Sequence, residues 1–187
     1  MTVNFFDPKP VNIDLCNRLF ELSRNSPSGI IRKIDRGPRK KGDKAGSLKR
    51  TGYYVVSINR EAHFVHRVIF AMYYGIDPGG SHIDHIDGDI INNDPLNLRL
   101  ATRPENNSNA IIRKDNTTGT KGLLINRRKN RRDSIVCAIK SNGKVFKKQF
   151  SIEKRNEAEE WIRNKRIELH GQFHNHGTKR DIPGERP

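Results

Sequence analysis

Hydrophobic residues in the first part of the chain occur in short groups separated by polar turns. The spacing of Leu15 and Leu19 within residues 12–24 predicts a short helix, and a run of isoleucines predicts a strand beginning at Ile30. Residues 36–50 then contain seven basic side chains among glycines and a proline, which predicts a loop. Its composition suits phosphate binding, and a merely solvated basic surface is an equally good interpretation.

The middle of the chain shows the pattern of two strands followed by a helix. Residues 53–58 and 62–65 predict strands joined by a turn, and the apolar segment 68–74 predicts a short buried helix. After an asparagine-rich turn, the composition from Pro104 onward favours another helix, with Thr102 as its N-cap.

The last third predicts a small module of three strands and one helix. An Asn-Gly pair at 142–143 is a strong signal for a hairpin between the second and third strands. One face of the segment 153–170 collects apolar residues at helical spacing, which predicts the helix. The three expected strands are residues 121–126, 134–140 and 144–150.

The high positive net charge of the chain indicates a polyanionic partner. The 187 residues contain 36 Lys and Arg against 21 Asp and Glu, giving a net charge of +15 and a pI near 10.2. Residues 111–187 hold 20 basic and 9 acidic side chains, whereas residues 1–110 hold 16 and 12. The C-terminal third is therefore the stronger candidate for contacting phosphate, although a generic basic surface is the alternative.

Composition also argues against several other classes of protein. No apolar run approaches the roughly 18 residues that span a membrane, and the first residues do not resemble a secretion signal. Cys16 and Cys137 form no CxxC pattern, so we expect neither a thiolate zinc site nor a disulfide. These features favour a cytoplasmic protein.

The most informative segment, residues 83–109, contains a carboxylate, an imidazole and two amides. Asp84 and His85 are adjacent, Asn97 follows, and Asn106 lies on the helix expected from Pro104 onward. A carboxylate and an amide oxygen can hold a hard cation such as Mg²⁺, and a histidine can take a proton from water near neutral pH. Asn97 can tie backbone groups of the intervening loop together. These residue types are what a one-metal nuclease requires.

A calcium-binding loop and a histidine zinc site are two alternative interpretations of this part of the chain. In a calcium loop with Gly88 at its sixth position, Ile83 would be first and cannot ligate, so that pattern fails. A zinc site built from His63, His66 and His82 lacks a clear ligand register, and we keep it as a minor alternative.

Residues 19–109 resemble the HNH homing endonucleases of phages and mobile introns. The motifs GYYVVSI, HFVHRVIFAMYYG, IDHIDGD, NLR and ATRPENNSN carry the likeness. The resemblance implies a ββα-metal nuclease unit in which Asp84 and Asn106 bind one Mg²⁺ or Mn²⁺ per active site. His85 would be the general base and Asn97 the structural asparagine of the catalytic motif. Asn106 replaces the histidine of the family name, which favours oxygen ligation.

Residues 116–177 resemble the AP2 DNA-binding domain, through Thr118-Gly119, Gly122, the NGK hairpin and the LHGQF helix end. The resemblance implies a three-stranded sheet that lies in the major groove. Ile135-Val136 and Lys148 depart from the pattern, so some base contacts would be replaced by phosphate contacts. The candidate DNA contacts are Lys121, Arg127, Arg128, Arg132, Lys140 and Lys147.

The sequence therefore predicts an α+β protein, a ββα-metal (HNH) nuclease unit followed by a small three-stranded antiparallel sheet plus helix of AP2 type. Its expected parts are residues 1–50 (N-terminal part of the nuclease region), 51–112 (nuclease core), 116–177 (DNA-binding domain) and 178–187 (tail). The predicted activity is metal-dependent cleavage of double-stranded DNA to 5′-phosphate and 3′-hydroxyl ends. One active site per chain favours nicking.

The sequence leaves the oligomeric state undecided, with a monomer slightly favoured. A phage-encoded chain would act in the host cytoplasm. The rival class is a non-catalytic DNA-binding regulator built on a nuclease scaffold, against which all four motif positions carry competent side chains.

Overall fold

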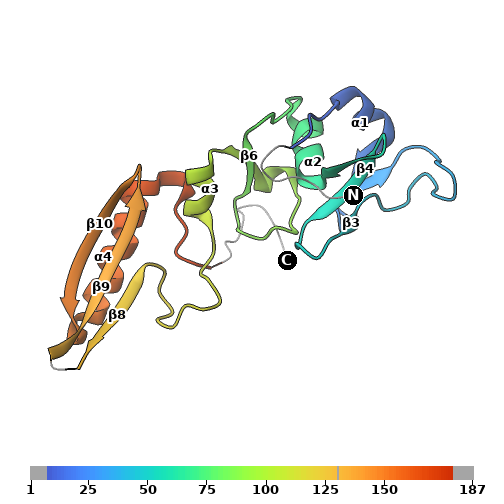
Figure 1. Cartoon of the computed structure of the whole chain (residues 1–187). Helices are drawn as coiled ribbons and strands as arrows, with labels where there is room; N and C mark the ends of the chain where they lie inside the picture. The colour runs from blue at the N-terminus through green and yellow to red at the C-terminus, as the bar shows by residue number, and fades with distance from the viewer. Residues whose placement is uncertain (1–7, 130, 179–187) are drawn as a thin grey trace. The chain divides into compact units, whose positions relative to one another are not determined.

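The computed structural model describes residues 8–129 and 131–178, which form two compact units (Figure 1). Among these residues the first unit ends at Thr102 and the second begins at Arg103, and each has its own hydrophobic core. Both combine helices with small antiparallel sheets, so the predicted α+β class is confirmed. The break at Thr102 lies earlier in the chain than residue 112, where the predicted nuclease core ends.

The first unit contains two α-helices, seven short strands and one 3₁₀ turn within residues 8–102. In chain order they are α1 (Ile13–Leu19), β1 (Phe20–Leu22), β2 (Ile30–Arg32), β3 (Ser47–Leu48), β4 (Tyr54–Ile58), β5 (Glu61–Phe64), α2 (Val65–Tyr74), β6 (His82–His85), η1 (Pro95–Asn97) and β7 (Leu98–Ala101).

The first helix is shorter than the sequence pattern predicts. The side chain of Asn12 caps α1 by accepting a hydrogen bond from the Leu15 amide at 2.9 Å, and the helix ends at Leu19. The prediction of a helix to residue 24 is wrong, because the next residues pair with β2 in an antiparallel ladder. That pairing buries Phe20, and tertiary contact overrides the helical spacing.

A three-stranded sheet and the helix α2 form the centre of the first unit. The sheet has the order β3-β4-β5, and β4 joins β5 through a turn in which Asn59 and Arg60 both have positive φ, as a tight hairpin turn requires. The fully buried Val65, Val68 and Ile69 of α2 pack in the core beside Val56. The strands and the helix predicted here are confirmed.

The strands β6 and β7 form a separate antiparallel hairpin that carries the motif residues. Asp84 is opposite Arg99 and His85 is opposite Leu98 in the register. The loop between the two strands contains η1. Asp84-His85 therefore precedes a polar loop that is closed by two paired strands.

The second unit is a three-stranded sheet with a helix along one of its faces (Figure 1). The strand β9 is central, between β8 and β10, and the Asn142-Gly143 turn joins β9 to β10. Side chains from the sheet, including Leu123 and Ile135, pack with Ile162 of the helix. The elements are α3 (Arg103–Asn109), β8 (Leu123–Arg128), β9 (Arg131–Ser141), β10 (Lys144–Ser151), η2 (Ile152–Lys154), α4 (Arg155–His170) and η3 (Gly171–Phe173).

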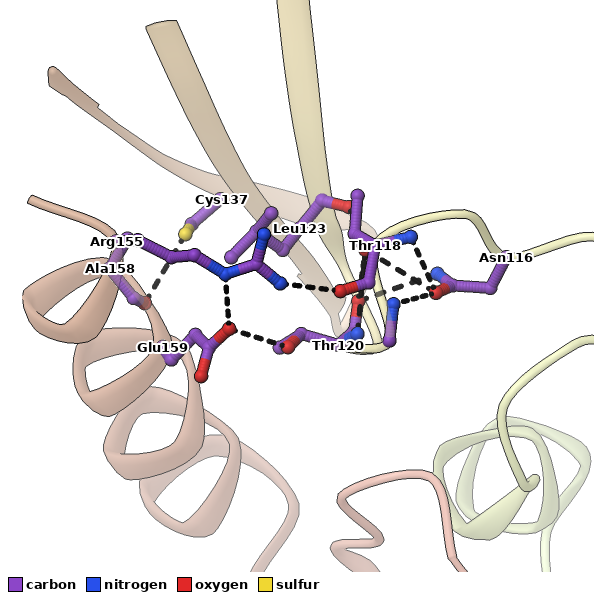
Figure 2. A network of polar contacts seen from close by, with 9 residues as sticks. Asn116, Thr118, Thr120, Leu123, Cys137, Arg155, Ala158 and Glu159 are labelled. Atoms are coloured by element: carbon purple, nitrogen blue, oxygen red, sulfur yellow. Dashed lines mark hydrogen bonds and ion pairs between the residues drawn. The ribbon is translucent and has the colours of Figure 1, made fainter. Parts of the chain in front are cut away.

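A network of polar contacts attaches the turn before β8 to the beginning of α4 (Figure 2). Arg155 donates to the Thr118 carbonyl at 2.7 Å and to Glu159 at 3.0 Å, and the Thr120 hydroxyl donates to Glu159 at 3.1 Å. Asn116 accepts hydrogen bonds from two amides of the same turn. The turn is thereby fixed against the helix.

Close packing explains Gly122, where the turn enters β8. Its φ is +77°, and a Cβ there would lie 2.7 Å from the Ala138 carbonyl oxygen and 2.9 Å from Ile162. Only glycine fits both the backbone conformation and the space.

The helix α3 is fastened within the second unit. The Ser108 hydroxyl lies 3.2 Å from Nδ1 of His170, and the buried Asn175 donates to Asn109 at 3.4 Å. Lys121 donates to the carbonyls of Ser108 and Ala110. Asn106 is thus presented by a helix that packs with the C-terminal module.

Candidate active site

The carboxylate of Asp84 is buried and ion-paired across the β6–β7 hairpin. It is 3% exposed, and both Nε and Nη2 of Arg99 approach its Oδ2 atom, at 2.8 and 2.7 Å. The register makes the two residues direct cross-strand neighbours. Arg99 thus supplies the opposite charge that a buried carboxylate needs.

His85 is oriented by an asparagine from the following loop. Its Nε2 atom lies 3.2 Å from Oδ1 of Asn93, whose amide nitrogen donates to the Ser28 carbonyl at 3.1 Å. That second bond fixes which end of the Asn93 amide faces the ring. Because an amide oxygen only accepts, Nε2 carries the hydrogen, and the neutral ring has its lone pair on Nδ1.

Aromatic rings pack beside His85. The His66 ring lies 5.2 Å from it in an edge-to-face arrangement, Tyr53 lies 6.4 Å away, and Phe64 stacks on His66 at 5.3 Å. Burial lowers the pKa of His85 below its ordinary value, and the hydrogen bond to Asn93 offsets part of this effect. Burial likewise holds the pKa of His66 well below the usual range. Both imidazoles are therefore neutral at neutral pH.

Asn97 ties the ends of the β6–β7 loop together. Its fully buried side chain accepts from the Asp87 amide at 3.0 Å and donates to the Asp87 carboxylate at 2.9 Å and to the Asn92 carbonyl at 2.8 Å. Its own carbonyl accepts from the Ile86 amide at 2.8 Å. The side chain makes its contacts to the loop from inside the protein.

The fourth motif residue, Asn106, lies on α3 in the second unit, whereas Asp84, His85 and Asn97 lie in the first. Its side chain is partly buried. Within residues 8–129 and 131–178, no group of three or more His, Cys, Asp or Glu side chains is arranged to hold a metal ion. Asp84 and Asn106, one carboxylate and one amide, are a smaller ligand set than such a group.

Arg67, which follows His66 on α2, has a structural role. Arg67 is buried, and its guanidinium donates to the carbonyls of Ser81, at 2.7 Å, and Gly79. It thereby fixes the turn between α2 and β6, directly before Asp84.

The predicted DNA contacts occupy different surroundings in the second unit. Lys140 and Lys147 are exposed, and strand alternation places both on the sheet face opposite the buried Ile139 and Cys137. Arg127 and Arg132 are exposed near the β8–β9 turn. Lys121 instead binds backbone carbonyls of its own unit, and we assign it a structural role. The Arg128 side chain lies outside what the structure describes.

Sequence reasoning missed the residues that support His85. Asn93 belongs to an asparagine-rich turn whose composition only indicates a turn, and Ser28 is 65 residues away from it. The hydrophobic pattern assigns Tyr53 and Phe64 to strands without a link to the site. No local pattern relates these positions, so the chain's short-range signals could not reveal them.

The stretch of chain that carries these residues matches a known family of enzymes. Residues 63–108 match the family model of the HNH endonuclease, and this stretch contains all four motif positions. The chain belongs to the HNH endonuclease family and is a DNA-hydrolysing enzyme.

A protein of Escherichia phage T7, Protein 3.8, is 41% identical to this chain over 98 residues. The alignment covers 51% of this chain and 75% of the phage protein. No solved structure matches. Among the described residues, no helix has the length and apolar character needed to cross a membrane.

Proposed function

We propose that this protein is a metal-dependent, homing-type DNA endonuclease that cleaves one strand at a time and leaves 5′-phosphate and 3′-hydroxyl ends. The observation that carries the proposal is the match of residues 63–108 to the HNH endonuclease, together with a buried, neutral and oriented His85. One such motif per chain corresponds to one cut strand.

The donor chemistry of Asp84 and Asn106 fits a hard divalent cation. A carboxylate and an amide supply oxygen ligands, which Mg²⁺ and Mn²⁺ prefer, and Mg²⁺ needs few protein ligands because it keeps several waters. Arg99 holds the Asp84 side chain in place through its Oδ2 atom. Bound by these residues, the ion would stabilise the negative charge that develops on the leaving 3′ oxygen.

His85 is the proposed general base. With Nε2–H donating to Asn93, the lone pair on Nδ1 is the one that can accept a proton from the attacking water. Its lowered pKa keeps the ring neutral and ready to accept that proton at neutral pH. The Ser28–Asn93–His85 chain of hydrogen bonds holds the ring orientation, so proton transfer requires no rearrangement.

The second unit is the proposed DNA-binding module, of AP2 type. Its sheet leaves one face uncovered by α4, and Lys140 and Lys147 lie on that face beside the exposed Leu124 and Val145. A basic sheet face of this kind can enter the major groove, with lysines contacting phosphates. The excess of positive charge in residues 111–187 supports this assignment.

A plasmid-nicking experiment tests the catalytic proposal. The protein is incubated with supercoiled DNA in Mg²⁺, in Mn²⁺ and in EDTA, and the open-circular product is measured. We expect nicking with either ion and none in EDTA. His85→Ala should abolish nicking with DNA affinity nearly unchanged, while His174→Ala, a histidine of the second unit, should nick normally. Intact plasmid in both metals, or equal loss of binding and cleavage in His85→Ala, would refute the assigned roles.

A further inference from the structure

A basic cleft lies in the first unit, outside residues 63–108. The segment 36–50 folds against β2, where the Arg32 amide donates to the Asp43 carbonyl at 2.9 Å and the Ala45 amide donates to the Ile30 carbonyl at 3.1 Å. Its last residues continue into β3, which pairs with β4. The basic segment is therefore fixed by backbone hydrogen bonds rather than merely solvated.

Between this segment and the β3–β4–β5 sheet is an open cleft of about 380 Å³. It is lined by four cationic side chains and by Ser47 and Ser57, whose hydroxyls can donate hydrogen bonds. The four cations are Arg32, Arg39, Lys44 and Lys49. Ligand pockets in proteins begin at about 300 Å³, so a phosphate with its attached sugar has room here.

Arg32 is the strongest sign that the cleft takes an anion. Arg32 as a whole residue is 7% exposed, and its Nε atom is buried without a hydrogen-bond partner. Within the described residues its guanidinium forms no ion pair, although Asp43 lies near enough to favour its charged form. The Asp43 carboxylate accepts a hydrogen bond from the Lys40 amide at 2.6 Å. A buried guanidinium N–H that lacks an acceptor is costly, and a bound anion would supply one.

Repulsion among the cationic side chains also favours binding of an anion in the cleft. Burial and the neighbouring Arg39 and Arg36 lower the pKa of Arg32, an effect that a bound anion would reverse. Within the described part of the chain, neither Arg39, Lys44 nor Lys49 forms an ion pair with an acidic side chain.

We propose that this cleft binds a backbone phosphate of the DNA that the enzyme cleaves. The proposal rests on the proposed function for the identity of the polyanion. The residues lining the cleft, all in the described part of the chain, include no aromatic ring to stack on a base and no carboxylate to bind a ribose hydroxyl. A site whose polar side chains are arginines, lysines and serines holds phosphate without reading sequence, so it positions the duplex.

Binding of a short DNA duplex, measured by fluorescence anisotropy across a range of salt concentrations, tests the cleft. All variants carry His85→Ala, so that no cleavage interferes. The triple variant Arg39→Gln, Lys44→Gln, Lys49→Gln should bind DNA several-fold more weakly. Its plot of log affinity against log salt should lose about 0.9 in slope for each phosphate no longer held. The matched control is Arg18→Gln, an exposed arginine on α1, which should leave the slope unchanged.

Arg32→Met separates a binding role from a structural role. Removing an unpaired buried charge should leave the melting temperature unchanged or raise it, while DNA affinity falls. A lower melting temperature with unaltered DNA affinity would mean that Arg32 supports the fold, and would overturn the proposal.

A third measurement distinguishes DNA from free phosphate. Inorganic phosphate should raise the melting temperature of the parent and not of Arg32→Met. If phosphate stabilises the parent but the triple variant binds DNA like the parent, the cleft is a site for free phosphate and the proposal is wrong. Because these measurements need no cleavage, they test the cleft even if the nicking assay fails.

Discussion

Replacing Asn97 by alanine tests how the β6–β7 loop is held. The fully buried amide makes three side-chain hydrogen bonds, two to Asp87 and one to the Asn92 carbonyl. A neutral hydrogen bond contributes about 1 kcal/mol net and one to a carboxylate about 1.5–3 kcal/mol, and the Asp87 amide would lose its side-chain partner. We therefore expect Asn97→Ala to lower the free energy of unfolding of the first unit by about 3–5 kcal/mol.

Urea unfolding followed by far-UV circular dichroism measures this loss, and hydrogen exchange locates it. Trp161, the only tryptophan in the sequence, belongs to the second unit, so its fluorescence is not a probe of the first. The amides of residues 86–97 should exchange faster in the variant, because the Asp87 amide loses its acceptor.

A matched control is Asn17→Ala, an exposed asparagine on α1, which should change stability by no more than about 0.5 kcal/mol. Asn97→Asp should cost at least as much as alanine, since its second oxygen would face the Asp87 carboxylate in place of a donor. A loss below about 1 kcal/mol in Asn97→Ala, with unaltered exchange in the loop, would refute the inference that this side chain holds the loop.

Two further predictions concern the second unit. The double variant Lys140→Gln, Lys147→Gln should weaken DNA binding, and its plot of log affinity against log salt should lose about 0.9 in slope for each phosphate that is no longer bound. The control is Lys148→Gln, whose side chain lies on the helix-facing side over the Phe150 ring and which should not reduce the slope. Equal slopes in the parent and both variants would remove the open sheet face from the proposed DNA interface. Gly122→Ala should destabilise the second unit by more than Gly143→Ala does. Both glycines have positive φ, but only at Gly122 would a Cβ meet neighbouring atoms. Urea unfolding followed by Trp161 fluorescence measures both losses, and equal losses would mean that backbone strain alone explains the glycine at position 122.

Local patterns in the sequence predicted most of the regular elements. The strands β4, β5 and β8 to β10 and the helices α2 and α4 follow from hydrophobic spacing, because that spacing decides which face of an element can be buried. The Asn142-Gly143 hairpin is confirmed, since both residues adopt the positive φ that this turn requires. The failure at the first helix shows the limit of such patterns: Phe20 is buried by pairing with a later strand, which the spacing within its own segment does not encode.

The sequence by itself determined the residue types, order and spacing of Asp84, His85, Asn97 and Asn106, and through them the family. Only the tertiary structure decided how His85 is oriented, because the Ser28–Asn93 hydrogen bond joins positions 65 residues apart. It alone showed that the Lys121 ammonium holds carbonyls and that the Arg32 guanidinium lies buried in a cationic cleft. Charge and spacing are properties of the chain, whereas the partner of a charge depends on which distant residues folding brings beside it.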